Sequence, residues 1–295
     1  MSKKITTKQN QKVKSHQVHK VLPSAWNITK KSLTLLWQHK QLFIGITIVY
    51  GLLTLLLVGL ASNTDINNLK AQINQSFNGR LGSSLAVFVS LLGSSGNSSN
   101  TSAGAYQFFL GLLASLAIIW ALRQVISGVS IRIRDTYYRG IYPLVPFVLV
   151  LLVVGLQLLP LLIGAAIYTQ VMSNGIAVML VEKLVWATVF GLFTLLSLYL
   201  VSSSIFALYI VTLPDMTPIK ALRSAHELVK GRHWLLIPKI LFLPLVMVVL
   251  SAILLLPFIL WLTVLAQSIF FALSMLSLVV MHSYLYTLYR ELINE

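Results

Sequence analysis

Two short sequences place histidines where metal chemistry could be expected. His226 and Glu227 begin the sequence His-Glu-Leu-Val-Lys, and a zinc-protease helix needs a second histidine four residues after the first, so that both reach one metal. Lys230 occupies that position here. His16 and His19 have helical spacing but no third ligand near them. We therefore expect no metal, no cofactor and no catalytic residue in this chain.

A second group of polar side chains falls inside long apolar stretches, where a polar residue is a functional candidate by default. The candidates for an intramembrane polar site are Gln157, Ser203 within the run Ser202–Ser204, Gln267 and His282. They could line a path for a polar solute. They could equally make helix–helix hydrogen bonds, which contribute about 0.6 kcal/mol each on average. The second interpretation is favoured because none of them is a carboxylate or a permanent cation.

The composition indicates that these side chains are held by membrane-spanning helices. Of the 295 residues, 57% are hydrophobic and only 10% are charged, and the mean hydropathy is +0.85. A soluble domain carries about 25% charged residues, so the apolar surface of this chain must face lipid. The absence of cysteine excludes disulfides and thiolate sites. The sequence predicts an all-α, polytopic transmembrane helical bundle with amphipathic helices on its inner surface.

Gaps between charged residues predict the spans, because a bilayer core needs about 20 apolar residues per helix. Six spans are expected, near residues 41–61, 105–122, 142–168, 184–211, 240–260 and 266–288. The last two share one uncharged stretch, which is too long for a single helix. Pro257 and Gln267 bracket the turn expected between them.

The basic residues predict the orientation. The net charge is +15, and with the N-terminus inside, 19 of the 22 lysines and arginines fall on inner segments. Excess Lys and Arg on cytoplasmic loops is the positive-inside rule. Both termini are therefore expected on the cytoplasmic side of a bacterial inner membrane. This distribution also accounts for the charge without nucleic acid as a partner.

The remaining segments complete the predicted organisation. Residues 1–22 contain six lysines and no acid, which predicts a disordered basic cytoplasmic tail rather than a signal peptide. Residues 23–290 form the six-span membrane domain, and residues 291–295 a short cytoplasmic C-terminus. The outer loop 62–104 is rich in Asn, Ser and Gly and is expected to be flexible.

Amphipathic helices are expected on the inner surface before spans one, three and five, each followed by an out-and-back pair of spans. The first covers residues 23–40, with an apolar face of Trp26, Leu33, Leu36 and Trp37 and with Lys30, Lys31 and Lys40 elsewhere. The second covers Arg123 to Arg139, with Val125, Val129 and Ile133 as its apolar residues. This order suggests three repeated units, each an elbow and a hairpin.

The third amphipathic helix covers residues 217–231. Thr217 is the expected N-cap, Pro218 lies in the first turn and Gly231 ends the helix. Its expected apolar stripe is Ile219, Leu222, Ala225 and Val229, and Arg223 and Glu227 have the spacing of an ion pair. Basic faces of such helices lie on anionic headgroups. The expected headgroup contacts are Lys220, Arg223, Lys230, Arg232, Arg132 and Arg134.

Aromatic residues at the inner helix ends are a further membrane signal. Tyr and Trp anchor helices at headgroup level. The tyrosines in this position are Tyr137, Tyr138, Tyr142, Tyr284, Tyr286 and Tyr289. They are expected to need no ligand.

The segment from Thr217 to Trp234, Thr-Pro-Ile-Lys-Ala-Leu-Arg-Ser-Ala-His-Glu-Leu-Val-Lys-Gly-Arg-His-Trp, resembles a loop of a known family. The loop precedes the fifth helix in six-helix bacterial membrane proteins related to the membrane domain of glycerophosphoryl diester phosphodiesterases. The stretch Ser32 to Phe43 fits the first helix of that family. The resemblance implies the membrane unit without the hydrolase barrel of the two-domain relatives.

The expected function is that of a non-catalytic integral inner-membrane protein with a role in envelope or lipid physiology. Its expected partners are the bilayer and anionic phospholipids at the inner face, while no protein partner is indicated. The alternative is a transporter or permease subunit for a small molecule, which requires the intramembrane Gln and Ser residues to face one another. An intramembrane enzyme is disfavoured, because the chain has only seven acids and none falls inside a predicted span.

Overall fold

The computed structural model describes residues 23–57, 101–261 and 263–293, and within these ranges the chain is helical and contains no strand. Six of the described helical segments are long and apolar enough to cross a bilayer. They are Lys40–Leu57, Gly104–Ile126, Leu144–Ser173, Leu180–Ile210, His233–Leu255 and Ser268–Ile293. The predicted all-α fold with six spans is therefore confirmed, and the chain is a multi-pass membrane protein. The predicted tail 1–22 and residues 62–100 of the predicted outer loop lie outside the described residues.

The first unit consists of α2 (Ala25–Gln38), α3 (Lys40–Leu57) and α6 (Thr101–Ile126). Helix α6 begins four residues before the predicted span and includes the end of the predicted loop 62–104. Helices α3 and α6 pack against each other, and α2 packs on the C-terminal helix of the chain.

The second unit begins with the short helix α7 (Ile133–Gly140) and continues with α8 (Leu144–Gln157) and α9 (Leu159–Ser173), which together form the third span. Helix α10 (Leu180–Ser204) returns along α9, and the short helix α11 (Ala207–Ile210) completes the fourth span.

The third unit consists of α12 (Pro218–Val229), α13 (His233–Trp261) and α14 (Thr263–Ile293). The turn between α13 and α14 falls between Pro257 and Gln267, as predicted, and α14 continues three residues into the predicted C-terminal segment 291–295. Each of α2, α7 and α12 precedes a pair of packed spans, which is the predicted order of elbow and hairpin.

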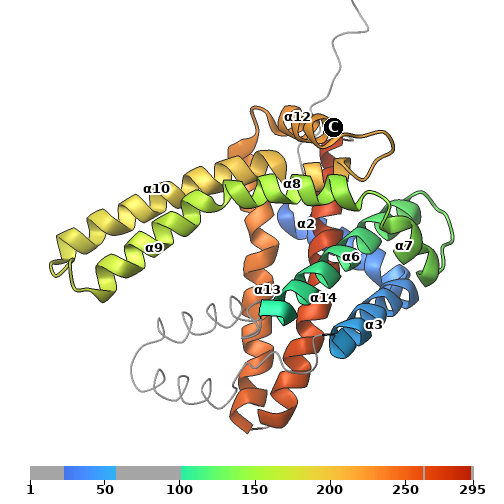
Figure 1. Ribbon diagram of the computed structural model, residues 1–295, viewed down its shortest axis with the longest axis horizontal. Coiled ribbons are helices and arrows are strands. Elements are labelled where there is room, and N and C mark those ends of the chain that lie inside the picture. The colour runs from blue at the N-terminus through green and yellow to red at the C-terminus, as the bar shows by residue number, and fades with distance from the viewer. Residues whose placement is uncertain (1–22, 58–100, 262, 294–295) are drawn as a thin grey trace, which may run out of the picture.

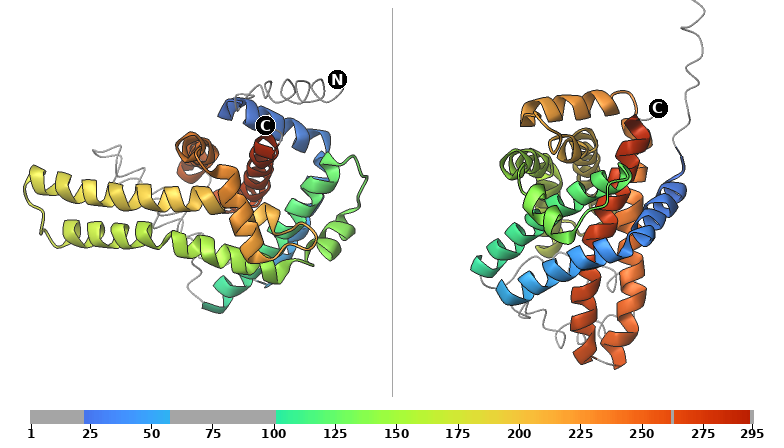
Figure 2. Two further views of the ribbon diagram at one scale, coloured as in Figure 1. Left: turned by 90° about the horizontal axis from the view of Figure 1, so that it is seen from above. Right: turned by 90° about the vertical axis from the view of Figure 1, so that its right-hand side faces the viewer.

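The three pairs of spans leave a common centre in different directions. Figure 1 shows the α9–α10 pair extending across the direction of the α13–α14 pair, and Figure 2 shows the α3–α6 pair pointing along neither of them. An apolar stretch of 18 residues in the fourth span is only 6% buried inside the protein. Lipid must therefore cover most of α9 and α10, because their apolar side chains have few protein neighbours.

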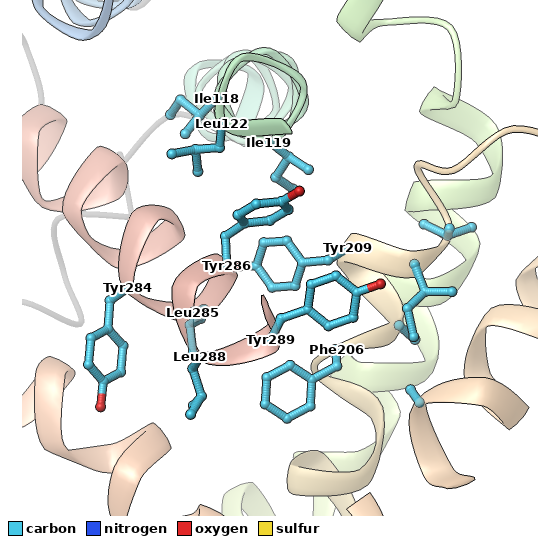
Figure 3. Close-up of a cluster of buried hydrophobic side chains, with 14 of the residues drawn as sticks. Ile118, Ile119, Leu122, Phe206, Tyr209, Tyr284, Leu285, Tyr286, Leu288 and Tyr289 are labelled. Carbon is cyan, nitrogen blue, oxygen red and sulfur yellow. The ribbon is translucent and has the colours of Figure 1, made fainter. Parts of the chain in front are cut away.

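The common centre is an aromatic and aliphatic core built where α6, α8, α11 and α14 meet. Figure 3 shows Tyr286 and Tyr289 of α14 reaching toward Tyr209 of α11. Their ring centroids lie 5.8 and 6.0 Å from that of Tyr209, in the range of favourable aromatic pairs. Tyr284 is also fully buried, and its hydroxyl donates to the carbonyl of Lys239 at 2.6 Å. The prediction that these C-terminal tyrosines anchor in the headgroups is wrong, because the core takes them up.

The centre also ties together the segments predicted to lie on the inner side. Lys31 on α2 forms a 2.6 Å ion pair with Glu291 at the end of α14. The Lys239 ammonium donates to the carbonyl of Pro23 at 2.9 Å, and Arg123 donates to the carbonyl of Thr212 at 2.8 Å. These segments are far apart in the sequence, which predicts all of them on one membrane face, and in the structure they lie side by side.

The predicted helix from Arg123 to Arg139 is wrong. Helix α6 ends at Ile126, α7 begins only at Ile133, and between them Gly128 has φ +75°. Glycine takes this left-handed conformation without steric cost, so the chain turns there. Of the three apolar residues of the predicted helix, Val125 lies at the end of α6, Val129 in the connection and Ile133 at the start of α7.

Candidate functional site

The basic surface predicted on α12 is present in the structure. Thr217 caps the helix, since its hydroxyl oxygen accepts a hydrogen bond from the amide of Lys220 at 3.4 Å. Lys220, Arg223 and Lys230 are exposed on the side away from the protein, whereas Arg232 is half-buried.

Two details of the α12 prediction are wrong. The buried stripe of α12 consists of Ala221, Ala225 and Val229, while Ile219 is 80% exposed. Ala225 and Val229 lie in the packed face as predicted and Leu222 is half-buried, whereas Ala221 takes the place of Ile219. These small residues let α12 pack against α10 and α11. Arg223 and Glu227 make no ion pair, and both remain exposed.

The outward face of α2 carries apolar and basic side chains together. Trp26, Leu33 and Trp37 are exposed, in agreement with an interfacial helix, while Leu36 packs on the core. Lys30 is predicted to lie away from the tryptophan face, but its ammonium lies 5.8 Å from the ring centroid of Trp26. This part of the prediction is therefore wrong. Tryptophan beside lysine is typical of the membrane interface.

Arg132 lies in a second basic region, at the junction of α2 and α3. It lines a cavity of about 640 Å³ with Lys40, and the other residues that line the cavity are Gln38, His39, Gln41, Leu42, Ile131 and Ile133. Arg134 is exposed on α7, outside this lining. The sequence predicted a headgroup contact for Arg132, but it did not indicate that Lys40 and Arg132 share one cavity, because a gap of more than ninety residues separates them.

The intramembrane polar candidates do not form a single site. Gln157 lies where α8 ends and α9 begins, and its side-chain nitrogen donates to the hydroxyl of Ser204 at 2.8 Å. The hydroxyl of Ser197 donates to the backbone carbonyl of Gln157 at 2.8 Å. The side-chain oxygen of Gln157 is buried and has no hydrogen-bond partner among the described residues.

The break at Gln157 has a direct cause in the sequence. Pro160 is in the first turn of α9, and proline lacks the N–H that would bond to the carbonyl four residues earlier. Pro160 therefore offers no amide to the carbonyl of Leu156, while the hydroxyl of Ser197 donates to the carbonyl of the next residue, Gln157. The role of Pro160 is therefore a local one.

The serines at the end of α10 interrupt the fourth span at the same place. The hydroxyls of Ser202 and Ser203 donate to the carbonyls three residues before them, at 2.7 Å each. Such bonds compete with helical hydrogen bonds and bend helices. Helix α10 ends at Ser204, and a short turn separates it from α11. Two successive spans are thus broken side by side.

A second polar contact on α10 involves residues that the sequence did not single out as site residues. Ser202 Oγ lies 3.1 Å from Nδ1 of His233, which is buried at the start of α13. The ring of His226 on α12 lies 6.2 Å from that of His233. The nearest sequence signal is the spacing of seven residues between these two histidines, which places them at a helix–helix corner.

His282 lies apart from this group. Its Nδ1 is 3.2 Å from the hydroxyl of Tyr209, within the aromatic core. The side chain of Gln267 lies outside the described residues. Gln157 and His282 therefore make their hydrogen bonds with different partners, Ser204 on α10 and Tyr209 on α11.

Two carboxylates, those of Glu182 and Glu291, make contacts that hold the fold together. The Glu182 carboxylate accepts hydrogen bonds from the amides of Val178 and Met179 at 2.8 and 3.0 Å, which caps α10. Glu182 and Glu291 both fall within the ends of observed span segments, Leu180–Ile210 and Ser268–Ile293, so the expectation that no acid falls inside a span is wrong at these two ends. Among the described residues, no group of three His, Cys, Asp or Glu side chains could hold a metal ion.

Comparison of the chain with models of protein families, with curated proteins and with solved structures found no match.

Proposed function

We propose that this chain is a non-catalytic, multi-pass protein of a bacterial cytoplasmic membrane, where it binds anionic phospholipids through its basic end and acts in envelope or lipid physiology. The observation that carries the proposal is the joining of the basic segments: α2 is paired with the end of α14, the start of the described chain with α13, and the end of α6 with the segment that leads into α12. The exposed Lys220, Arg223 and Lys230 then lie together on α12. Clustered basic side chains beside membrane helices attract anionic headgroups.

The positive-inside rule assigns this basic end, and with it both termini, to the cytoplasm. Single cysteines test the orientation cleanly, because the natural chain has none. Asn174→Cys, at the exposed tip between α9 and α10, is expected to react with an impermeant thiol reagent in intact cells. Ser127→Cys, in the exposed loop after α6, is expected to react only after lysis. The opposite pattern would reverse the orientation.

The resemblance of residues 217–234 to six-helix relatives of glycerophosphoryl diester phosphodiesterase membrane domains is compatible with a lipid-related role. It supports the proposal through one loop, which is the loop that carries the exposed basic side chains of α12. Those relatives place the hydrolytic chemistry in a separate barrel, so the likeness gives no reason to propose catalysis for these spans.

Lipid selectivity tests the proposed function directly. The full chain in detergent is offered phosphatidylglycerol and phosphatidylcholine together, and native mass spectrometry counts the lipid that remains bound. The variant with Lys220, Arg223 and Lys230 changed to Gln is expected to lose preference for phosphatidylglycerol by about 1 kcal/mol per charge. The variant Lys220→Arg with Lys230→Arg keeps the charge and is expected to keep the preference. Equal preference in all three proteins would refute the proposal.

The alternative function, a transporter or permease subunit, is favoured by one observation: Gln157 and Ser204 face each other at two broken spans, and discontinuous helices often form transport sites. Against it, the serines lining a cavity of about 290 Å³ between α13 and α14 donate to carbonyls of their own helix. Ser204→Cys separates the two functions, because a water-filled path makes this thiol reactive toward a small charged thiol reagent, whereas a dry contact leaves it unreactive.

A further inference from the structure

Two cavities follow one another along helix α3. The first is the basic cavity of about 640 Å³, lined by Lys40 and Arg132. The second is an apolar groove of about 570 Å³ between α3, α13 and α14. Its wall on α3 consists of Ile44, Thr47, Ile48, Gly51, Leu52 and Leu55.

The first cavity has the chemistry of an anion site. Lys40 and Arg132 bring two positive charges from different segments, and no carboxylate lines the cavity. The amides of Gln38 and Gln41 add neutral donors. Lys40 also lies 5.4 Å from the ring centroid of the exposed Trp37, which places the cavity at the level where Trp and Lys meet the headgroups.

The second cavity has the chemistry of a hydrocarbon site. Except for Thr47, its lining side chains are apolar or absent, and the Thr47 hydroxyl donates to the carbonyl of Phe43 at 2.8 Å. The groove therefore offers no free polar group from α3 to a ligand. Gly51 keeps the groove open, because an added Cβ there would only just contact Phe271, at 3.8 Å.

The two cavities are in register on one face of α3. Lys40, Ile44, Thr47 and Gly51 are spaced by four, three and four residues, and residues with this spacing share a helix face. From Ile44 to Leu55 the helix rises roughly 16 Å at 1.5 Å per residue. Half of a hydrocarbon core of about 30 Å is about 15 Å. The groove thus has about the length of one leaflet, and its first lining residue on α3, Ile44, follows Lys40 of the basic cavity by about one helical turn.

We propose that these two cavities together bind one anionic phospholipid, with its phosphate between Lys40 and Arg132 and an acyl chain in the groove of α3, α13 and α14. This inference rests on the proposed function and gives it a discrete site. A soluble phosphate would use only the first cavity and a neutral lipid only the second. A phospholipid with an anionic headgroup matches the charge of one and the apolar length of the other.

The test uses the full chain in detergent and measures retained phosphatidylglycerol by native mass spectrometry. Lys40→Gln with Arg132→Gln is expected to weaken retention of one phosphatidylglycerol about 30-fold, as expected for two basic residues. Gly51→Leu, which fills the groove, is expected to weaken retention of the same lipid. Ile48→Trp, at an exposed position of the groove, fills it in a second way and is expected to have the same effect. Arg139→Gln with Lys183→Gln removes equal charge at exposed positions outside both the cavities and the basic surface of α12, and is expected to spare this lipid.

The opposing results are distinct. Equal losses from the variant at Lys40 and Arg132 and from the control variant would overturn the discrete site while leaving the proposed function intact. No loss from the variant at Lys40 and Arg132 would also overturn the discrete site, and no loss from the α12 variant as well would overturn both. Displacement of the lipid by millimolar glycerol 3-phosphate, together with full retention in both groove variants, would show that headgroup charge alone suffices and would overturn the role of the groove. Helix content by circular dichroism confirms that each variant is folded.

Discussion

The side-chain amide of Gln157 on α8 donates a 2.8 Å hydrogen bond to the hydroxyl of Ser204 on α10, and this bond joins the points at which two successive membrane spans are interrupted. Ser197, two turns earlier on α10, donates to the backbone carbonyl of the same glutamine. One residue is therefore held at both its side chain and its backbone by one neighbouring helix. This contact therefore links α10 to the point at which α8 passes into α9.

The first prediction concerns the strength of this contact. Gln157→Leu and Ser204→Ala, combined in a double-mutant cycle, are expected to show a coupling of about 0.6 to 1.7 kcal/mol, the range found for side-chain hydrogen bonds between membrane helices. Reversible unfolding in mixed micelles measures it. Thr194→Ala is the matched control on α10, because that hydroxyl donates to the carbonyl of Phe190 on its own helix, and its coupling to Gln157 should be near zero. A coupling at Ser204 equal to that control would contradict the prediction.

The second prediction concerns the close packing of α9 on α10. A Cβ added at Gly164 would lie 2.9 Å from Cβ of Phe193, so Gly164→Ala must push the helices apart. Overpacking of this kind costs about 1 to 3 kcal/mol. Gly191→Ala on α10 meets nothing within 4 Å and is expected to be neutral or slightly stabilising. Thermal unfolding of the two variants in detergent distinguishes them, and equal melting temperatures would refute the packing argument.

The number, order and approximate bounds of the spans could be predicted from the sequence, because charge-free length and hydropathy act locally. The contacts that each side chain makes with other helices could not be predicted in this way. His282 and Gln157 both lie inside apolar stretches, and nothing in the sequence shows that one meets Tyr209 while the other meets Ser204. Likewise, a tyrosine at a helix end has the same local signature whether it is exposed, as Tyr142 is, or fully buried, as Tyr284 is. The position of a residue along a span follows from the local composition, whereas its contacts follow from how the three pairs of spans pack together.

The third prediction concerns pH. Tyr137 on α7 donates to the carbonyl of Ile46 on α3 at 2.8 Å. Burial, and to a lesser degree the neighbouring Tyr50 phenol, raises the pKa of Tyr137 above its ordinary value of 10.0. Because the pKa is raised in the folded state, the unfolded chain loses this proton first as pH rises. The stability that the neutral phenol contributes is therefore complete below pH 10 and is lost above it.

Tyr137→Phe tests this sign. The variant is expected to be about 1 kcal/mol less stable than the natural chain between pH 7 and 9, because one hydrogen bond is removed. The difference should shrink as the pH passes 10, since the natural chain alone loses the contribution of Tyr137. Unfolding measured at several pH values checks this. Tyr142→Phe, at a residue that is 94% exposed, should leave the pH profile unchanged, and a constant difference for Tyr137→Phe would be the contrary result.

The last prediction concerns the direction of the α9–α10 pair, which runs across the α13–α14 pair (Figure 1). Helices in bilayers tilt by about 0–40° from the membrane normal, so two crossing pairs cannot both span one bilayer without reorienting. The paired interruptions at Gln157 and Ser204 are where α9 and α10 can turn together. In a bilayer, the tip of this pair should therefore approach the turn between α13 and α14, because the connections between spans three and four and between spans five and six must lie on the same side of the membrane.

Spin labels on paired cysteines measure this movement. The distance between Asn174→Cys and Ser268→Cys is expected to be shorter in lipid nanodiscs than in detergent, because both positions then lie near the outer surface. The distance between Thr169→Cys on α9 and Thr188→Cys on α10 should not change, since the hairpin moves as one body held by the contact of Gly164 with Phe193. An unchanged distance from Asn174 to Ser268 would mean that α9 and α10 keep one direction in both environments. A change within the hairpin would place the flexibility in α9 and α10 themselves rather than at Gln157.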